Sequence, residues 1–541
     1  MTVIELDAVI VGAGLSGIYL LQRLRDELHL KVKIFEAAPE VGGVWYWNTY
    51  PGARVDCPVP AYAFDFEKVW STWKWSQLYP DQKELQAYFR HVDQVMEISK
   101  DTFFNSRVNG AQFNPDTARW TVTTEDGKKM VAKYFIPAAG FAEQEHVPQW
   151  KGYETFEGDI HHTSCWPSGG VDVKGKRVAI IGTGATGVQV TQEWAKESDE
   201  TFVFQRTPNY ALPINQETID ETTQKKFQKE TGDIFAFSAT TIGGLAWHST
   251  TKNYDDYGSQ EELEKILNEM YDKGGFHFWT GGIADLFINP VGNRIVYDTW
   301  AKRVRQRVQD PVKAELLAPR EPPHPFATKR PSLERDYYEQ FNRPNVHIVD
   351  TNAHPILEIR PQGIVTDDGK LYQVDAIAVA TGFDAGTGSL AKLNVRDVDG
   401  VDLSSRWKDG IQSFLGMTVP GFPNMFIPYS VQSPAPWTNG PVFLRLQVDW
   451  IRDMIAKIEK EGIRYIDPHK EKAQAWRDEL LAVTNMTLFP KAKSWYMGAN
   501  VPGKRVELMY FPAPMPMYFE RCAAARDGQF AESFFASRNA A

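Results

Sequence analysis

LDAVIVGAGLSG, Leu6 to Gly17, decides the fold of this chain. Its first half is largely apolar, as expected of a buried strand, and Gly12, Gly14 and Gly17 follow as GxGxxG at the start of a predicted helix. The first glycine of this pattern allows a tight turn, the second lets a pyrophosphate approach the backbone, and the third lets helix pack on strand. The stretch therefore predicts a dinucleotide-binding α/β unit.

A second copy of the same device follows later in the chain. GKRVAIIGTGATGVQV, residues 175–190, again has an apolar strand, a glycine turn and the start of a helix. Two such units predict an α/β protein with two Rossmann-like dinucleotide-binding domains. The glycines of the second copy are Gly182, Gly184 and Gly187.

The strand after each glycine motif ends in a charge, and the two charges have opposite signs. Glu36 comes 24 positions after Gly12, and Arg206 comes 24 positions after Gly182. An acid at this place accepts hydrogen bonds from ribose hydroxyls, whereas a guanidinium suits a 2′-phosphate. We therefore expect FAD in the first unit and NADPH in the second, where Thr207 offers a further hydroxyl.

Two apolar strands end in alanine-glycine turns, AKYFIPAAG at Gly140 and DAIAVATGFD at Asp384. They bracket the second unit, which predicts that it is inserted into the first. Residues 213–328 contain charged, helix-prone segments such as SQEELEKILNEMYDKGG, which predict a helical insertion. We expect an FAD-binding domain in 1–141 and 383–541, a linker in 142–151, and an NADPH-binding domain in 152–212 and 329–382.

Composition excludes several classes of function. The 541 residues carry a net charge of -10, which is unfavourable for nucleic acid binding. The three cysteines include no CxxC pair, so we expect no disulfide chemistry. No run of about 18 apolar residues predicts a membrane span, and the acidic start is unlike a signal peptide. The sequence thus indicates a reduced, cytoplasmic protein, and no obligate protein partner is evident.

Two nucleotide units together predict an oxidoreductase that passes hydride from NADPH to FAD. A reduced flavin can then give its electrons to a disulfide, to a protein or to oxygen. The lack of a dithiol removes the first possibility. A different class of function also remains open for these residues, namely a binding or redox-sensing protein that holds both nucleotides without oxygenating a substrate.

Two further stretches resemble the signatures of type I Baeyer–Villiger monooxygenases, and the similarity to cyclohexanone and phenylacetone monooxygenases covers nearly the whole chain. GGVWYWNTYPGARVD, residues 42–56, resembles the longer signature, and FEGDIHHTSCWP, residues 156–167, resembles the shorter one. Flavin monooxygenases that oxidise nitrogen or sulfur usually carry another aromatic residue where this chain has Trp166. The residues that fill the two signatures are Gly42, Gly43, Trp45, Tyr50, Pro51, Gly52 and Asp56, then Phe156, Gly158, His162, Trp166 and Pro167.

The resemblance implies a reaction. An enzyme of this family uses NADPH and O2 to insert oxygen beside a ketone carbonyl, through a flavin C4a-peroxide stabilised by an arginine and bound NADP+. The product is an ester or a lactone. The alternative is an N- or S-oxidising flavin-containing monooxygenase.

The resemblance also implies roles for residues. ATKRP, residues 327–331, resembles the catalytic arginine segment, with Arg330 as the arginine and Asp56 as its partner. Lys329 is expected at the 2′-phosphate, and Gly43 and Trp45 beside the flavin. SWYMGANVPGKR, residues 494–505, resembles a mobile segment near 485–505 that covers the nicotinamide with Trp495.

The shorter signature raises the question of a metal site. His161, His162 and Cys165 offer three ligands at an unusual spacing, whereas zinc sites generally use four. We therefore expect no metal. His162 and Trp166 are expected to couple the two domains, with His162 supporting domain movement and NADP binding.

Two other stretches bear on the substrate pocket. PYSVQSPAPWTNGP, residues 428–441, departs from the family, where relatives commonly have a shorter glycine-rich turn. The aromatic run GGFHFWTGGIADLF, residues 274–287, could form a wall of the ketone pocket, but such a run is more often ordinary core, and we assign no site residues to it.

Overall fold

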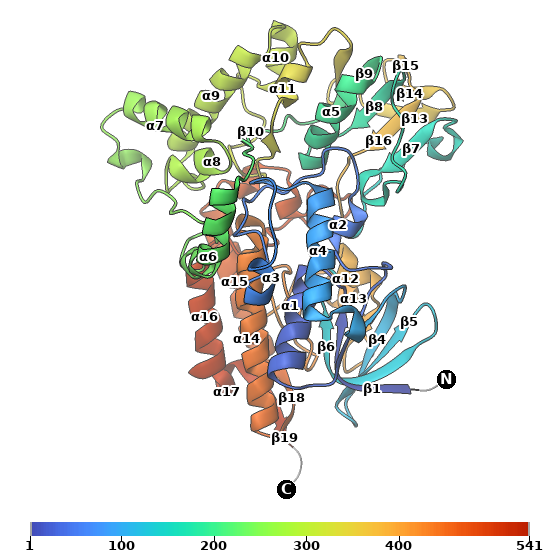
Figure 1. Cartoon of the computed structure of the whole chain (residues 1–541), viewed down its shortest axis with the longest axis vertical. Coiled ribbons are helices and arrows are strands. Elements are labelled where there is room, and N and C mark those ends of the chain that lie inside the picture. The colour runs from blue at the N-terminus through green and yellow to red at the C-terminus, as the bar shows by residue number, and fades with distance from the viewer. Residues whose placement is uncertain (1–2, 539–541) are drawn as a thin grey trace.

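The computed structural model describes residues 3–538 (Figure 1), and its largest sheet has seven strands. β1 lies near the middle, parallel to β2 on one side and to β6 on the other. β4, β5 and β6 continue as an antiparallel meander. In spatial order the strands are β17 (Val395–Arg396), β4 (Val108–Asn114), β5 (Arg119–Thr124), β6 (Lys129–Pro137), β1 (Val3–Val11), β2 (Val32–Phe35) and β3 (Thr102–Phe103).

The second sheet has five strands, and all its pairings are parallel. Parallel strands need crossovers, and helix α5 (Ala185–Glu197) supplies the one between β8 and β9. The predicted α/β class with two dinucleotide-binding units is confirmed. In spatial order the strands are β12 (Val346–Asp350), β9 (Glu200–Gln205), β8 (Arg177–Ile181), β16 (Ala376–Val379) and β7 (Asp159–His162).

The order of the strands along the chain shows how the two sheets are connected. The chain leaves the first sheet after β6, builds the second sheet from β7 to β16, and returns to the first sheet as β17. The second unit is therefore inserted into the first. A small antiparallel sheet, β13 (Ile356–Arg360), β14 (Gly363–Thr366) and β15 (Leu371–Gln373), sits within the insertion. The residue limits of the domains stay predictions.

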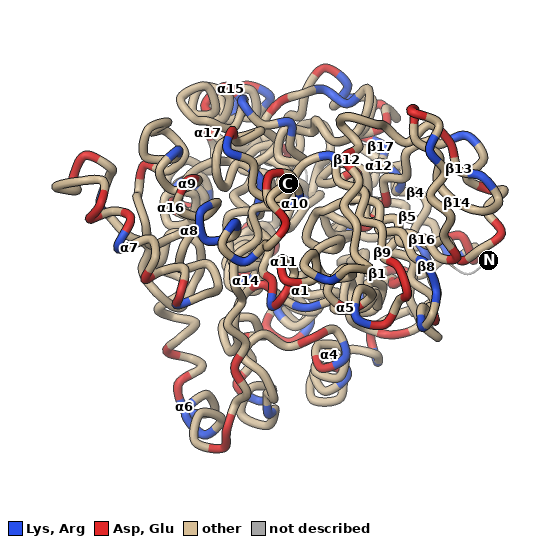
Figure 2. The backbone as a smooth tube through the Cα atoms, turned by 90° about the horizontal axis from the view of Figure 1, so that it is seen from above, with Lys and Arg blue, Asp and Glu red and all other residues tan. Residues whose placement is uncertain are grey.

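A group of helices occupies the chain between β9 and β12. It stands at the upper left of Figure 1, and Figure 2 shows it from above. The short strands β10 (Leu212–Pro213) and β11 (Leu333–Glu334), which precede α6 and α11 in the chain, pair in parallel. The N-termini of α6 and α7 are capped by Asp220 and Ser259, whose side-chain oxygens accept backbone N–H groups. The helices are α6 (Glu221–Ser238), α7 (Gln260–Lys273), α8 (His277–Gly281), α9 (Pro290–Arg307), α10 (Pro311–Leu317) and α11 (Tyr337–Gln340).

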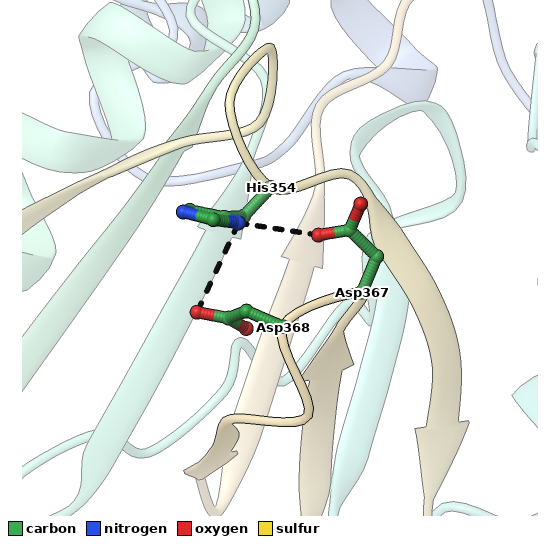
Figure 3. Close-up of side chains that lie close together, drawn as sticks. All are labelled: His354, Asp367 and Asp368. Atoms are coloured by element: carbon green, nitrogen blue, oxygen red, sulfur yellow. Dashed lines mark hydrogen bonds and ion pairs between the residues drawn. The ribbon is translucent and has the colours of Figure 1, made fainter.

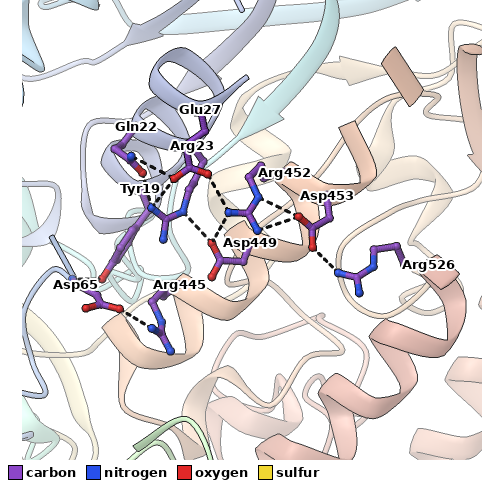
Figure 4. A network of polar contacts seen from close by, with 10 residues as sticks. All are labelled: Tyr19, Gln22, Arg23, Glu27, Asp65, Arg445, Asp449, Arg452, Asp453 and Arg526. Atoms are coloured by element: carbon purple, nitrogen blue, oxygen red, sulfur yellow. Dashed lines mark hydrogen bonds and ion pairs between the residues drawn. The ribbon is translucent and has the colours of Figure 1, made fainter. Parts of the chain in front are cut away.

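The C-terminal helices α14 (Gly440–Lys460), α15 (Lys470–Asn485) and α16 (Met515–Asp527) flank the first sheet (Figure 1). α14 packs on α1 (Leu15–Leu21), the helix that follows the first glycine motif. A network of charged side chains links α14 to the π-helical turn after α1 (Figure 4), with Arg23 bound to Asp449 at 2.8 Å. Since this turn continues α1, the C-terminal helices help to hold the helix of the first dinucleotide site.

Both glycine motifs are built by the same close approaches. A Cβ on Gly17 would lie 1.9 Å from the carbonyl oxygen of Gly12, and one on Gly187 would lie 2.0 Å from that of Gly182. Gly12 and Gly182 have φ of +100° and +107°, a region that favours glycine. Each helix thus begins in direct contact with the preceding turn, as expected from the sequence.

The buried interior is shared by the two sheets. The main core cluster runs from the first sheet through α14 to the insertion helices, and a smaller cluster lies beneath the three-stranded sheet. Within residues 3–538 no helix combines the length and apolarity needed to cross a membrane.

Replacing Gly17 by alanine is expected to destabilise the protein by about 3 kcal/mol, because the added methyl group overlaps a backbone oxygen. Gly232 is a suitable control, since it lies in α6 and a Cβ there meets no atom within 4 Å. Gly232→Ala should stabilise the protein by roughly 0.5–1 kcal/mol through helix propensity. Urea unfolding measures both. Equal effects of the two substitutions would contradict the close approach at Gly17.

Candidate active site

Arg330 and Asp56 form a bidentate ion pair between distant parts of the chain. Arg330 Nε donates to Asp56 Oδ2 at 2.7 Å, and Nη2 donates to Oδ1 at 3.1 Å. Asp56 ends the loop that follows α2 (Val44–Trp47), and Arg330 lies between α10 and β11. Two parallel N–H···O bonds fix the plane of the guanidinium as well as its position.

The rest of the guanidinium is also enclosed. Arg330 Nη1 donates to the carbonyl oxygen of Pro436 at 2.7 Å, and Cys57 Sγ lies 3.8 Å from Nη2. The rings of Phe276 and Trp279 face the guanidinium carbon, with centroids at 4.8 and 5.7 Å. Aromatic faces attract a cation and exclude water. Arg330 is thus held by groups from three separate segments of the chain, residues 56–57, 276–279 and 436.

The charge of this site is permanent. Burial of the guanidinium disfavours its charged form, but Asp56 outweighs burial, and the pKa of Arg330 lies above its ordinary value. About 20% of the side chain remains exposed. The site therefore presents one fixed positive charge, partly accessible, in a poorly hydrated setting.

The loop that carries Asp56 lies against the first glycine motif. A Cβ on Gly43, where φ is +55°, would be 2.9 Å from the Cα of Gly14. Trp45 Nε1 donates to the hydroxyl of Tyr62 at 3.0 Å and fixes the ring beside the loop. The signature loop therefore packs directly on the second glycine of the motif, and this close approach requires glycine on both sides.

Glu36 lies at the end of β2, where the sequence predicted a partner for ribose. Its carboxylate accepts backbone N–H groups from Ala13 at 2.6 Å and from Ala38 at 2.7 Å. Burial raises the pKa of Glu36, although these N–H groups oppose the shift. The carboxylate is anchored beside the glycine turn with lone pairs left for further donors, which fits the ribose of FAD.

The corresponding place in the second sheet is basic. Arg206 is exposed and has no carboxylate partner within 4 Å among residues 3–538. Burial, with a contribution from Arg206, lowers the pKa of Lys329 from 10.5 to about 8. The backbone carbonyl of Thr207 accepts the hydroxyl of Thr183 at 2.7 Å. Two neighbouring cations without an acid fit the 2′-phosphate of NADP, and a Cβ on Gly184 would meet open space.

His162 and Trp166 lie where β7 ends. His162 Nε2 lies 3.1 Å from the carbonyl oxygen of Gly382, and Nδ1 lies 2.7 Å from Ser164 Oγ. Burial lowers the pKa of His162, so the neutral ring is favoured. Trp166 is buried against Trp194 of α5, with ring centroids 5.5 Å apart. The signature thus ties β7 to the turn through which the chain returns to the first sheet.

Trp495 lies beside the first sheet's own alanine-glycine turn. Its ring stacks on Phe141, which follows Gly140, at a centroid distance of 5.8 Å. The same segment reaches the other turn, because Asn500 Nδ2 donates to the carbonyl of Phe383 at 2.7 Å. Residues 494–505 therefore contact both alanine-glycine turns, where the chain leaves the first domain and where it returns to it.

The histidines of the shorter signature are not part of a metal-ligand cluster. Among residues 3–538, the group of acidic and histidine side chains whose ligand atoms converge is His354, Asp367 and Asp368 (Figure 3). All three are exposed and lie at the turns that join β12 to β13 and β14 to β15. His354 Nδ1 lies 3.2 Å from Asp367 Oδ1 and 3.9 Å from Asp368 Oδ2, and these contacts explain the arrangement without an ion.

A cleft of about 210 Å³ lies between the two sheets beside the ion pair. Asp56 and Tyr62 line it from the first domain, and Ala185 and Gln189 of α5 line it from the second. The ion pair is therefore at the place where the two dinucleotide sites face one another.

Comparisons with known proteins agree with this geometry. A family model for pyridine nucleotide-disulphide oxidoreductases matches residues 6–239. FAD-binding monooxygenase acrE of Aspergillus aculeatus is 44% identical over 95% of this chain and 86% of its own length. Cyclopentanone 1,2-monooxygenase of Comamonas sp. is 39% identical over 96% of this chain and 94% of its own. A Baeyer–Villiger monooxygenase of Pseudooceanicola batsensis is 35% identical, with coverage of 97% and 95%.

This chain belongs to the Baeyer–Villiger monooxygenases. The crystal structure of OTEMO in complex with FAD and NADP superimposes with a TM-score of 0.94, at 34% identity, over 99% of this chain and 100% of the other. As a Baeyer–Villiger monooxygenase the protein is an NADPH-dependent flavoprotein that uses FAD. The match covers both glycine motifs, and because the three cysteines of this chain are free, it reflects the shared nucleotide fold rather than a disulfide.

Three contacts of the Baeyer–Villiger monooxygenase site were missed from the sequence. Phe276 and Trp279 come from the aromatic run that we expected to be ordinary core, and Pro436 comes from the divergent segment 428–441. A backbone carbonyl leaves no signal in a sequence, so Pro436 was beyond reach. The two rings had a weak signal, since glycines flank an unusually aromatic stretch.

Breaking the ion pair from one side should cost more stability than removing it entirely. Asp56→Ala leaves a poorly hydrated guanidinium without its partner and is expected to cost about 2 kcal/mol. The double variant Asp56→Ala, Arg330→Met is expected to recover part of that loss. Chemical denaturation of the two single variants and the double variant measures the coupling. Additive losses would mean that the two side chains do not interact in solution.

Proposed function

We propose that this Baeyer–Villiger monooxygenase converts ketones into esters or lactones at the Arg330–Asp56 pair. The observation that carries the proposal is a permanent cation that is oriented by two hydrogen bonds and walled by aromatic rings, and whose partner Asp56 lines the cleft between the two dinucleotide units. Such a group stabilises negative charge that develops in a water-poor site.

Bound FAD and NADPH supply the hydride and the reduced ring at which oxygen is activated. Arg330 then has two tasks in our proposal. It favours an anionic oxidant over a protonated one, because an adjacent positive charge lowers the cost of the anion. It also stabilises the negative charge that develops on the ketone oxygen as the carbonyl carbon is attacked. Arginine suits both tasks because it does not give up its proton.

Asp56 acts on the reaction through Arg330. Its carboxylate fixes the guanidinium plane and balances the buried charge when substrate is absent. The carbonyl of Pro436 accepts a hydrogen bond from Nη1, the third nitrogen of the guanidinium. In the proposal, the remaining N–H of Nη1 is available to the substrate. Asp56 is thus an orienting residue whose loss would let the cation turn away.

We assign the remaining predicted residues to cofactor binding and domain coupling. Arg206, Thr207 and Lys329 are proposed to bind the 2′-phosphate, and Trp495 to cover the nicotinamide. His162 and Trp166 are proposed to transmit movement between the sheets through Gly382 and α5. In the proposal the glycines, with Glu36, Gly43 and Trp45, hold the dinucleotides: Gly12, Gly14 and Gly17 for FAD, and Gly182, Gly184 and Gly187 for NADPH.

Cyclic ketones are the first substrates to test. The names of two relatives specify cyclopentanone and cyclohexanone, and the walls of this site are aromatic. The test is a panel of cyclic, linear and aryl ketones with NADPH and oxygen, scored by ester or lactone formed. Oxidation of amines or sulfides without any ester would favour the N- or S-oxidising alternative.

Arg330→Ala is expected to oxidise NADPH but to form no ester, with hydrogen peroxide accounting for the NADPH consumed. A loss of this size corresponds to about 3–4 kcal/mol of transition-state stabilisation. Arg303→Ala is the matched control, because Arg303 also pairs with an aspartate, Asp272, and faces a ring, Tyr271, at 4.6 Å. The control should keep the ester yield. Measurable ester from Arg330→Ala removes Arg330 from the proposed role.

The affinity for NADPH is expected to fall as pH rises through about 8, the pKa of Lys329 in the free protein. Below this pH the ammonium is charged and attracts the 2′-phosphate, whereas above it a proton must be taken up on binding. The dissociation constant should therefore rise by up to about tenfold per pH unit above 8. NADH, which lacks the phosphate, should show no such rise. Lys329→Arg should flatten the NADPH profile, and a slope that persists in this variant contradicts the assignment.

A further inference from the structure

Gln189 of α5 makes two hydrogen bonds to the signature loop of the other domain. The hydroxyl of Tyr50 donates to Gln189 Oε1 at 2.9 Å, and Gln189 Nε2 donates to the carbonyl oxygen of Arg54 at 3.0 Å. The two partners stand at the ends of the turn that immediately precedes Asp56. One side-chain amide therefore clamps both ends of this turn with its donor and its acceptor.

The turn between these partners is pressed against the same helix. A Cβ on Gly52, where φ is +79°, would lie 2.6 Å from the backbone oxygen of Gln189. Thr186 Oγ1 lies 3.4 Å from the hydroxyl of Tyr50. The contact thus combines close backbone packing at Gly52 with directed polar bonds from the hydroxyl of Tyr50.

The turn leads directly to the ion pair. Val55 N–H donates to the carbonyl of Pro80 at 3.3 Å, and Arg54 Nη1 donates to Gln77 Oε1 at 2.8 Å. These bonds fix residues 54 and 55 on the side that faces away from Gln189. Asp56 follows within two residues of the clamped Arg54 carbonyl. Burial raises the pKa of Tyr50 to about 12, so its hydroxyl stays protonated as the donor to Gln189.

At its N-terminal end, α5 begins in the second glycine motif. The helix starts at Ala185, directly after Gly184, so its first turn belongs to the second dinucleotide site. Gln189 lies one turn further along the same helix. A shift of α5 relative to the first domain would therefore move both the dinucleotide site and the clamp.

We propose that Gln189 is a positioning residue that couples the second dinucleotide site to the catalytic pair, by holding the Tyr50–Arg54 turn and through it Asp56 and Arg330. The functional part of this inference rests on the role proposed for Arg330, whereas the tether itself does not. Gln189 contacts neither Arg330 nor Asp56, so it acts only through the loop.

The test measures backbone hydrogen exchange of residues 52–57 in the full-length protein without added nucleotide. Gln189→Met keeps the length of the side chain and removes both hydrogen bonds, and it is expected to speed exchange in this segment about tenfold. Tyr50→Phe removes one of the two bonds and should give a smaller increase. In the presence of FAD, NADPH and a ketone, Gln189→Met is expected to lower the ester formed per NADPH consumed at least threefold, with peroxide as the balance.

Gln192 provides the matched control on the same helix. It is buried, its Oε1 accepts the backbone N–H groups of Arg335 at 2.7 Å and Asp336 at 3.1 Å, and its Nε2 donates to the carbonyl of Val188, so its side chain makes no hydrogen bond to residues 42–56. Gln192→Met should speed exchange near residues 335–336 and leave residues 52–57 within twofold of the parent.

The outcomes separate the two proposals. Exchange of residues 52–57 that stays within twofold in Gln189→Met overturns the tether, even if the variant is less stable overall. Faster exchange with an unchanged ester-to-NADPH ratio overturns the coupling to catalysis. If exchange responds as expected while the parent protein forms no ester from any ketone, the tether stands and the proposed function fails.

Discussion

A guanidinium kept away from bulk water needs fixed partners, and this requirement organises the centre of the molecule. Arg330 takes Asp56 from the first domain, the carbonyl of Pro436 from the C-terminal part, and two rings from α8 and the residue before it. Each partner removes part of the cost of burying the charge. Because Arg330 contacts all the segments that carry these partners, it also links them to one another.

The two dinucleotide units show how one backbone device serves two cofactors. The glycines make the same contacts in both, with a Cβ on the third glycine excluded at 1.9 and 2.0 Å. What differs is the charge at the end of the next strand. Glu36 is anchored by two backbone N–H groups, whereas Arg206 and Lys329 stand without an acid. In the assignment that we propose, selectivity for the 2′-phosphate lies in a few side chains on a common scaffold.

Contacts between the domains lie on both sides of the cleft. His162 reaches the carbonyl of Gly382 on one side, and Gln189 clamps the turn before Asp56 on the other. Residues 494–505 touch both alanine-glycine turns. We propose that these contacts transmit the position of one sheet to the other while hydride donor, flavin and ketone are brought together.

The two nucleotide units, their order and their charges could be predicted from the sequence, because they depend on local patterns: glycine spacing, apolar strands and one residue at each strand end. The resemblance of their segments to a family also indicated Asp56 and Arg330. The enclosure of Arg330 by Phe276, Trp279 and Pro436, and the contact of Gln189 with Tyr50 and Arg54, became visible in the folded chain alone. These contacts join residues that are far apart in the chain, and two of them use backbone carbonyls, which every residue carries and no sequence pattern marks.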